Sequence, residues 1–232
     1  RIESVLRIVP GKRLTGISNW RNQSVIVKLF FGPGHWKRNL LSDIRGINLL
    51  RQRHILTPEI LHHTATFDGK GAVLLMDYLQ QGKSLLELVN EADSEDRKLA
   101  LINLTVANIA RCHGEGLWQN DIHLDNFMLV DDRVYVLDGG DINAVDTEIG
   151  WQQASENLSL FFAQFPVDID INIPALLEHY RSEGRNLADS DLNGFAERVI
   201  AQRIKRLNRF EKKLFRSTTA YRSIHELNRS VI

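Results

Sequence analysis

The stretch Asp121-Ile-His-Leu-Asp-Asn126, followed after a polar turn by Val134-Tyr-Val-Leu-Asp138, carries most of the information about the fold. An aspartate and an asparagine five residues apart place two short oxygen-bearing side chains on one loop. The polar turn predicts a hairpin that returns Asp138 beside the same loop. Carboxylate and amide oxygens suit Mg²⁺, a hard cation that shares its ligands with water and phosphate. We therefore expect the three side chains to share one site, in which the oxygen group not used by the metal orients a hydroxyl.

A second group of residues, upstream of this loop, offers a cation and an acid to pair with it. Ser24-Val-Ile-Val-Lys28 has the apolar, β-branched character of a strand, and its lysine ends the strand where it could hold nucleotide phosphates. Asp43 lies on the helix predicted over residues 40–52 and is the best candidate to pair with the ammonium group. Ahead of the strand, residues 14–19 predict a turn with Gly16 at its tip, which would cover the phosphates.

The pattern of apolar residues changes near the middle of the chain. Three short β-like segments fill residues 1–35, a helix follows, and two more strands lead to residue 79. Beyond a polar break at residues 80–82, most segments have the apolar spacing of helices. This order predicts an α+β fold with two unequal lobes rather than a doubly wound sheet. The small β-rich lobe would span residues 1–79, and the mostly helical lobe would span residues 80–232.

The composition is that of an ordinary globular protein and excludes several classes. Of the 232 residues, 43% are hydrophobic and 25% are charged, which excludes disordered and fibrous proteins. The single cysteine, Cys112, excludes a disulfide framework and a multi-cysteine zinc site. No apolar run approaches the roughly 20 residues that span a bilayer, and the start lacks the apolar core of a secretory signal. The sequence therefore predicts a cytoplasmic protein.

The charges balance overall but are unevenly distributed. Lys and Arg number 29, as do Asp and Glu, yet from Arg198 onward the chain has ten basic and two acidic residues. Apolar residues at helical spacing in this tail predict a C-terminal helix that packs on the helical lobe and has a solvated basic face. The alternative is a basic surface that contacts anionic lipid headgroups or a phosphorylated glycolipid. A nucleic-acid partner is not expected, because no aromatic platform accompanies the basic residues.

In chain order, these parts resemble a protein-kinase-like fold: phosphate loop, strand lysine, helix acid, linker, Asp-x-x-x-x-Asn loop, hairpin and Asp-Gly. Within that fold, the sequence resembles the bacterial lipopolysaccharide core kinases, which phosphorylate heptose or Kdo sugars. The resemblance extends over almost the whole chain, and the matching segments are residues 27–32, 43–50, 55–61, 121–127, 137–139, 156–158 and 213–221.

The resemblance implies a kinase that depends on ATP and Mg²⁺, and it gives each candidate residue a role. Lys28 would contact the ATP phosphates, with Asp43 as its partner. Asn126 and Asp138 would hold Mg²⁺, and Asp121 would be the base or would orient the acceptor hydroxyl. Adenine would receive backbone hydrogen bonds from the hinge residues Asp77, Tyr78 and Leu79. The implied acceptor is a sugar of the lipopolysaccharide inner core, so we expect peripheral attachment to the cytoplasmic face of the inner membrane.

Four departures from the kinase pattern qualify these roles. Gln119 stands where many kinases have histidine, and Gly139-Gly140 replaces the usual aromatic residue after Asp138. These changes leave open a pseudokinase that binds nucleotide without turnover. Asp43 is one methylene shorter than the usual glutamate, and no Ala-Pro-Glu motif follows. The missing motif favours a small-molecule or glycan kinase, and an aminoglycoside- or choline-type phosphotransferase or an atypical protein kinase remain alternatives.

Two polar neighbours of the loop have simpler interpretations. His123 lies inside the loop, where a structural histidine is favoured over a catalytic one. Asp141 follows the Asp-Gly pair and is expected to stabilise the turn rather than to bind metal.

Overall fold

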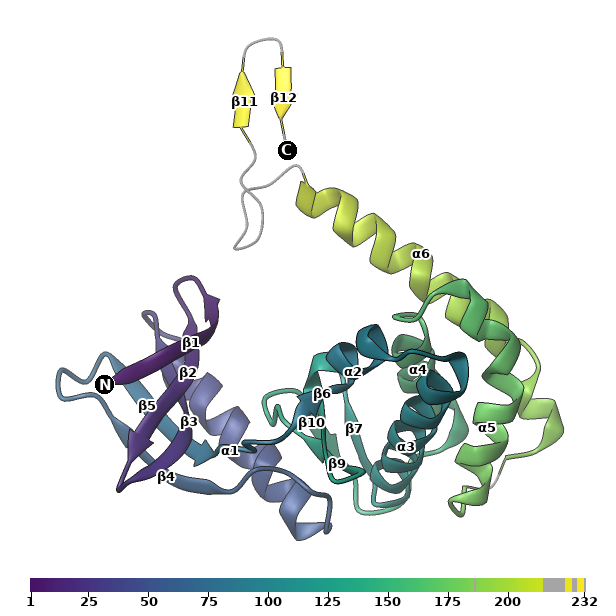
Figure 1. Ribbon diagram of the computed structural model, residues 1–232, viewed down its shortest axis with the longest axis horizontal. Helices are drawn as coiled ribbons and strands as arrows, with labels where there is room; N and C mark the ends of the chain where they lie inside the picture. Colours follow the sequence, from purple (N-terminus) through teal and green to yellow (C-terminus); the bar gives the residue numbers. More distant parts are fainter. Residues whose placement is uncertain (186, 215–223, 227–228, 232) are drawn as a thin grey trace.

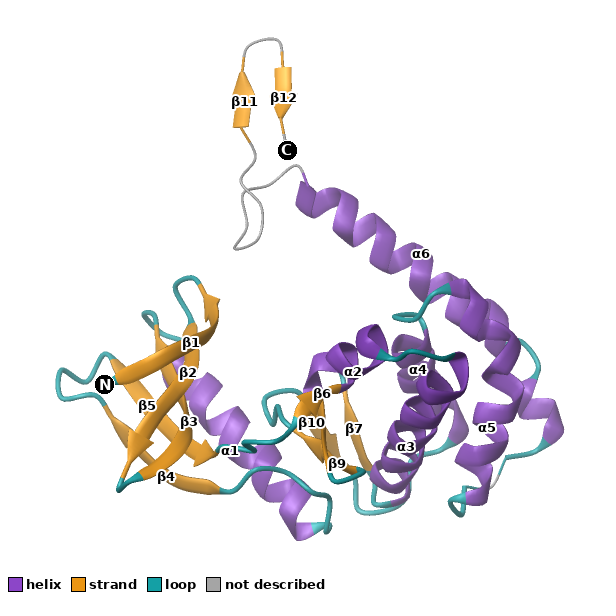
Figure 2. Cartoon of the chain, viewed as in Figure 1, coloured by secondary structure: helices purple, strands orange, loops and turns teal. Residues whose placement is uncertain are grey.

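The computed structural model describes residues 1–185, 187–214, 224–226 and 229–231. It confirms the predicted α+β class, with a small antiparallel sheet and one helix in an N-terminal lobe and mostly helices in a C-terminal lobe (Figures 1 and 2). The division predicted at residue 79 falls just after the last strand of the large sheet. In chain order the elements are β1 (Ile2–Val9), β2 (Arg13–Trp20), β3 (Gln23–Phe31), α1 (Trp36–Gln52), β4 (Ile60–Ala65), β5 (Gly71–Asp77), β6 (Lys83–Ser84), α2 (Leu85–Glu91), α3 (Glu95–Gly114), β7 (Leu117–Gln119), η1 (Leu124–Asn126), β8 (Phe127–Val130), β9 (Arg133–Val136), β10 (Ile142–Ala144), α4 (Trp151–Phe162), η2 (Val167–Asn172), α5 (Ile173–Ser182), η3 (Asp189–Leu192), α6 (Phe195–Leu214), β11 (Ile224–Glu226) and β12 (Arg229–Val231).

The N-terminal sheet has the order β1-β2-β3-β5-β4, and every neighbouring pair of strands is antiparallel. Helix α1 packs on this sheet through Leu40, Ile47 and neighbouring side chains, which join Phe30 and Leu74 in one buried cluster. Buried side chains predominate in β5, and Val25, Val27, Lys28 and Phe30 are buried in β3, because both strands lie in the interior of the sheet. The sheet thereby fixes Lys28 on β3 opposite the helix that carries Asp43.

The turn predicted over residues 14–19 is wrong. These residues form strand β2, in which Gly16 pairs with Val5 on one side and Val27 on the other. The hairpin turn lies earlier, at residues 10–12. Glycine is needed at position 16 because a Cβ atom there would lie 2.5 Å from the Ser4 carbonyl oxygen, where β1 presses closely on β2. Gly16 thus has a packing role in the sheet and does not form a phosphate-covering tip.

The C-terminal lobe is built around α3, whose buried face joins α4, α5 and the β8–β9 hairpin in one large core cluster. The predicted hairpin is present, with Phe127 opposite Val136 at its base. Two short strands, β7 and β10, pair with each other in antiparallel orientation. This pairing joins the residues before Asp121 to the residues after Asp138.

The helix predicted in the basic tail is α6 (Phe195–Leu214), which begins after a break in the helical conformation. Helix η3 ends at Leu192, and Gly194, at φ +77°, separates it from α6. Of the apolar residues expected to pack α6 on the lobe, Val199 is buried, whereas Ile200, Ile204, Leu207 and Phe210 are 43–57% exposed. The C-terminal part of α6 extends past the lobe (Figure 1). Arg216 and Arg222 of the predicted basic tail lie outside the described residues.

Among the described residues, no helix combines the length and apolar character needed to cross a membrane.

Candidate functional site

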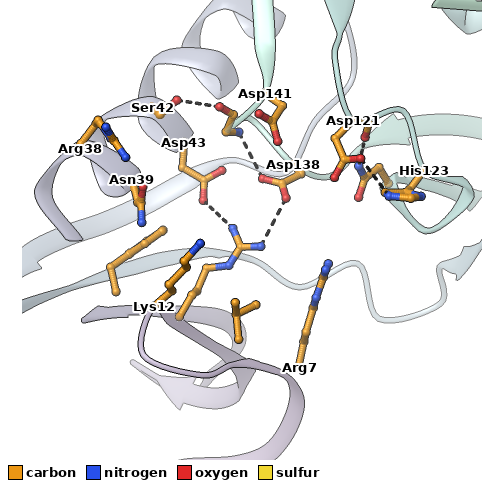
Figure 3. Close-up of a pocket in the computed structure, with 15 residues that line it drawn as sticks. Arg7, Lys12, Arg38, Asn39, Ser42, Asp43, Asp121, His123, Asp138 and Asp141 are labelled. Atoms are coloured by element: carbon orange, nitrogen blue, oxygen red, sulfur yellow. Dashed lines mark hydrogen bonds and ion pairs between the residues drawn. The ribbon is translucent and has the colours of Figure 1, made fainter. Parts of the chain in front are cut away.

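A pocket of about 550 Å³ lies where the two lobes meet (Figure 3). Its floor carries the carboxylates of Asp43, Asp121, Asp138 and Asp141, and basic side chains from the N-terminal lobe face them. Acidic groups on one wall and cations on the other suit a ligand that combines phosphates with a divalent cation. The lining residues are Arg7, Val9, Lys12, Arg13, Phe30, Arg38, Asn39, Ser42, Asp43, Asp121, His123, Asn126, Asp138, Gly140 and Asp141.

The structure brings Lys28, Asp43 and Asp138 together, although 15 and 110 residues separate Lys28 from the two acids along the chain. Lys28 Nζ donates to both carboxylate oxygens of Asp43, at 3.2 and 3.0 Å, and lies 3.6 Å from Asp138 Oδ1. Lys28 and Asp43 are both buried. Burial raises the pKa of Asp43, an effect that the neighbouring Lys28 opposes. A buried ammonium held between two carboxylates is positioned to receive a phosphate oxygen.

Arg13 is a member of this cluster that the sequence did not indicate. Its guanidinium lies 3.6 Å from Asp43 Oδ2 and 3.5 Å from Asp138 Oδ2, so it bridges the acid on α1 and the acid after the hairpin. Burial opposes the ionisation of Asp138, but Lys28 and Arg13 outweigh it and hold the pKa of Asp138 well below its usual range. Asp138 is therefore a carboxylate throughout the neutral range and is fit to bind a cation.

The loop that carries Asp121 is held by Gln164, which lies in the turn just after α4. Gln164 Oε1 accepts from the Leu124 backbone N–H, and its Nε2 donates to the Ile122 carbonyl. Asp121 itself is 63% exposed and points into the pocket, where His123 Nε2 lies 2.9 Å from its Oδ1. This contact with His123 lowers the pKa of Asp121. The loop thus exposes an ionised carboxylate, and hydrogen bonds to Gln164 fix its backbone.

Hydrogen bonding assigns a charge to His123. Its Nε2 faces Asp121 Oδ1, and its Nδ1 faces Gln164 Oε1 at 3.2 Å. Because Leu124 N–H already fixes Gln164 Oε1 as an acceptor, both ring nitrogens face acceptors. The imidazolium form satisfies both contacts, and the hydrogen bond to Asp121 raises the pKa of His123. His123 therefore positions Asp121, which goes beyond the loop-packing role predicted from the sequence.

We expect the His123 ring to titrate above the ordinary value of about 6.5, because the imidazolium is stabilised by Asp121. An NMR titration of the His123 ring protons would measure this pKa directly. In Asp121→Asn the pKa should fall, whereas Asp125→Asn, on the same loop but exposed, should leave it unchanged. An equal pKa in wild type and Asp121→Asn would contradict the pairing.

The departures at Gln119 and Gly139-Gly140 have structural explanations. Gln119 Nε2 donates to the Asp138 carbonyl at 3.2 Å, so its side chain ties the strand before Asp121 to the metal-binding candidate. A Cβ atom at Gly139 would lie 2.3 Å from the Asp43 carbonyl oxygen. The Gly139 N–H also donates to Asp43 Oδ1 at 3.2 Å. Glycine at position 139 thus allows α1 to approach the turn after Asp138 closely. The replacement of the usual aromatic residue by glycine removes no group that the site requires.

Asn126 and Asp138 fit the donor set of a Mg²⁺ site. Asn126 Nδ2 donates to the Asp121 carbonyl at 2.8 Å, which leaves the amide oxygen as the side-chain atom for a cation. The Asn126 carbonyl accepts from Leu137 N–H at 2.9 Å, so the loop and the hairpin exit are directly connected. Within the described part of the chain, no three His, Cys, Asp or Glu side chains form a metal cluster. Two protein oxygens suit a cation that takes its other ligands from phosphate and water.

The hinge residues line a separate apolar cavity of about 160 Å³ that reaches Lys28. Met76, Ile26 and Leu137 contribute to its walls beside the predicted hinge residues Asp77, Tyr78 and Leu79. The Asp77 N–H donates a hydrogen bond to the Glu59 carbonyl at 3.0 Å, so this N–H is not available to a ligand. The apolar lining of the cavity suits a nucleobase, and Lys28 beside it suits the phosphates of a nucleotide.

Of the predicted site residues, the structure gathers Lys28, Asp43, Asp121, Asn126 and Asp138 around one crevice, and it places Gly16 in a strand. Arg7, Lys12, Arg13 and Gln164 were missed. Pro10-Gly11 indicates a turn, and the basic residues Lys12 and Arg13 follow it directly. A hairpin turn carrying two cations could therefore have been predicted from the sequence. Gln164 gave no signal, because its role depends on α4 packing beside a loop 40 residues earlier.

A second histidine, His113, lies fully buried behind the site and is neutral. Its Nε2 donates to Asn157 Oδ1 at 3.0 Å, and its Nδ1 accepts from the Tyr180 hydroxyl at 2.8 Å. Asn157 Nδ2 continues this network to the Gln119 carbonyl. Burial lowers the pKa of His113 to about 4. The network therefore links α3, α4 and α5 to the strand before Asp121, and burial favours the uncharged ring.

We expect the free energy of unfolding to fall by about 2 kcal/mol between pH 7 and pH 5 because of His113. The unfolded ring binds a proton near pH 6.5, whereas the folded ring resists protonation until about pH 4. The stability is present above the unfolded pKa and is lost as the pH falls toward the folded pKa. Urea unfolding at both pH values measures the difference. His113→Gln should be less stable at pH 7 but should lose less on acidification; an unchanged acid loss would contradict this assignment.

Comparison with known proteins supports a distant relationship to kinases. No model of a known protein family matches the sequence. Among curated proteins, the sequence is similar to sperm motility kinase 2B of Mus musculus, with 27% identity over 157 residues. The match covers 66% of this chain but only 29% of the mouse protein. The similarity and the two-lobed structure together make the chain kinase-like in general.

Proposed function

We propose that the protein is an ATP- and Mg²⁺-dependent kinase that transfers the γ-phosphate to a sugar hydroxyl of the lipopolysaccharide inner core, a heptose or Kdo residue. The observation that carries the kinase activity is the contact of Lys28 with both Asp43 and Asp138 in a crevice that also exposes Asp121. The sugar acceptor is inferred from the sequence resemblance to lipopolysaccharide core kinases. Such a protein would work in the cytoplasm, at the cytoplasmic face of the inner membrane.

In this proposal, the residues act mainly by positioning and by neutralising charge. Asn126 and Asp138 would hold Mg²⁺, which would supply charge stabilisation to the phosphates. Lys28 holds phosphate oxygens, and Arg13, which now bridges two carboxylates, is close enough to turn its guanidinium to the same phosphates. Backbone groups of the hinge residues and the apolar cavity beside them hold adenine.

The transfer step needs a hydroxyl aligned with the γ-phosphorus. Asp121 accepts the hydroxyl hydrogen bond, and the hydroxyl oxygen forms a bond to phosphorus as the bond to the bridging oxygen of ADP breaks. The hydroxyl proton passes to Asp121 late in the step, because a carboxylate with a lowered pKa is a weak base at neutral pH. The His123 imidazolium keeps the carboxylate in place.

Two other functions are distinguished by the same assay. An aminoglycoside- or choline-type phosphotransferase, or an atypical protein kinase, would use the same nucleotide site with a different acceptor. A pseudokinase would bind nucleotide without transfer, although Gln119 and Gly139 have the structural explanations given above.

The test is ATP-dependent phosphorylation of delipidated core oligosaccharide, read by mass spectrometry with mapping of the modified hydroxyl. Free aminoglycosides, choline and a generic protein substrate are assayed in parallel. Transfer to the oligosaccharide alone supports the proposal, and transfer to another acceptor replaces it. Binding of Mg-ATP without transfer to any acceptor identifies a pseudokinase.

A further inference from the structure

A second hollow of about 670 Å³, here called the basic groove, lies between α6 and the loop that carries Asp121. It adjoins the phosphate pocket, because Arg7, Asp121 and His123 line both. Asp121 thus lies at the boundary between the phosphate pocket and the basic groove. Because the phosphate pocket has the chemistry for Mg-ATP, an acceptor hydroxyl can reach the Asp121 carboxylate from the basic groove.

The basic groove has a large excess of positive charge. Among the described residues, Asp121 is the only acidic one that lines it, whereas α6 contributes Arg203, Lys205, Arg206 and Arg209. Arg203 is already paired with Asp170 and also donates to main-chain carbonyls, which anchors α6 to the lobe. For Lys205, Arg206 and Arg209, the described residues provide no hydrogen-bond or ion-pair partner.

Arg206 is the most informative of these cations because it is half-buried. Burial lowers its pKa, and Asp121 acts in the opposite direction from across the groove. A partly desolvated guanidinium without a bound acceptor is unfavourable, so the site is poised for an anion. Arg209, three residues further along α6, lies on the same helix face, so the two guanidinium groups can bind the same ligand. Their planar forks match the oxygens of phosphate and carboxylate groups.

We propose that the basic groove is the acceptor site, and that Arg206 and Arg209 bind a phosphate or carboxylate group of the acceptor while its hydroxyl lies at Asp121. This inference rests on the proposed function and adds the requirement that the acceptor be anionic. Leu207 and Phe210, which also line the groove, provide apolar contact for the carbon skeleton beside the charged group. A membrane surface is a less suitable ligand, because these cations line a hollow beside the reacting carboxylate.

The experiment compares two double variants of α6. Arg206→Met/Arg209→Met removes two charges from the groove, and Arg198→Met/Lys212→Met removes two exposed charges of α6 outside it. Binding of delipidated core oligosaccharide is measured by calorimetry without nucleotide, and the kinetics of transfer are measured separately. The same oligosaccharide, after dephosphorylation and carboxyl reduction, serves as a neutral acceptor. ATP affinity and urea unfolding show whether each variant is folded.

We expect the groove variant to weaken binding of the anionic oligosaccharide about a hundredfold, since each lost charge-assisted contact contributes about tenfold. Its KM for this acceptor should rise to a similar extent, with unchanged ATP affinity. The control variant should bind the anionic form as wild type does, and the neutral form should bind wild type and the groove variant alike.

Three results would overturn the proposal: no binding of the anionic oligosaccharide to wild type, equal weakening in both variants, or equal weakening for the neutral form. Vesicles of phosphatidylglycerol and phosphatidylcholine at 1:3 are tested in the same way. If both variants lose vesicle binding equally and no oligosaccharide binds, α6 contacts membranes and the acceptor site is wrong. If the expected binding differences occur but wild type transfers no phosphate, the basic groove is an anion site and the proposed function fails.

Discussion

Replacing Asp138 by asparagine is expected to reduce phosphate transfer by about a thousandfold or more. The substitution keeps the size of the side chain but removes the carboxylate that faces Lys28 and Arg13 at 3.6 and 3.5 Å. An amide is a poorer ligand for Mg²⁺ and no longer offsets these two cations. The fold should survive, because the Gln119 side chain binds the Asp138 backbone carbonyl, which asparagine retains.

The measurements are phosphate transfer and the dependence of ATP affinity on Mg²⁺. In wild type, Mg²⁺ should strengthen ATP binding, and this enhancement should disappear in Asp138→Asn. Asp146→Asn is the matched control, because Asp146 is a fully exposed aspartate a few residues further along the chain. Retention of the Mg²⁺ enhancement in Asp138→Asn would show that the metal is held elsewhere. This readout does not depend on the identity of the acceptor.

Gly46→Ala is expected to impair both stability and activity, although alanine is the better helix former. Propensity alone predicts a gain of about 1 kcal/mol within α1. A Cβ atom at position 46, however, would lie 1.9 Å from the Gly139 carbonyl oxygen, and backbone cannot rotate away as a side chain can. The overpacking should cost about 3 kcal/mol, which outweighs the gain. The displaced α1 would also separate Asp43 from the Asp138 loop.

Urea unfolding and the transfer assay test this prediction together. A shift of about 1 Å between the lobes should lower the transfer rate of the folded variant by about a hundredfold. Gly150→Ala is the control, because a Cβ atom at Gly150 has no neighbouring atom within 4 Å, and it should change stability only slightly. If Gly46→Ala instead stabilises the protein, then α1 does not touch the Asp138-Gly139 turn as closely as described.

Local sequence patterns were sufficient for the fold class and for much of the candidate site. Lys28 ends an apolar β-branched run, and the hairpin that follows Asn126 has a polar turn of its own, so both could be located from neighbouring residues. The prediction for Gly16 was wrong because the sequence does not indicate whether a glycine forms a turn or allows two strands to approach closely. The same lack of a local sign affected α6, whose apolar residues have helical spacing but are mostly exposed.

The sequence by itself determined the division into a β-rich and a mostly helical part, the lysine at a strand end and the aspartate-asparagine loop before a hairpin. These features depend on hydrophobic periodicity and turn chemistry, which act between residues close together in the chain. Only the tertiary structure decided that Arg13 bridges Asp43 and Asp138, that Gly46 touches Gly139, and that α6 faces Asp121 across a basic groove. These contacts join segments up to 125 residues apart, and their energy arises from packing and burial that no local pattern encodes.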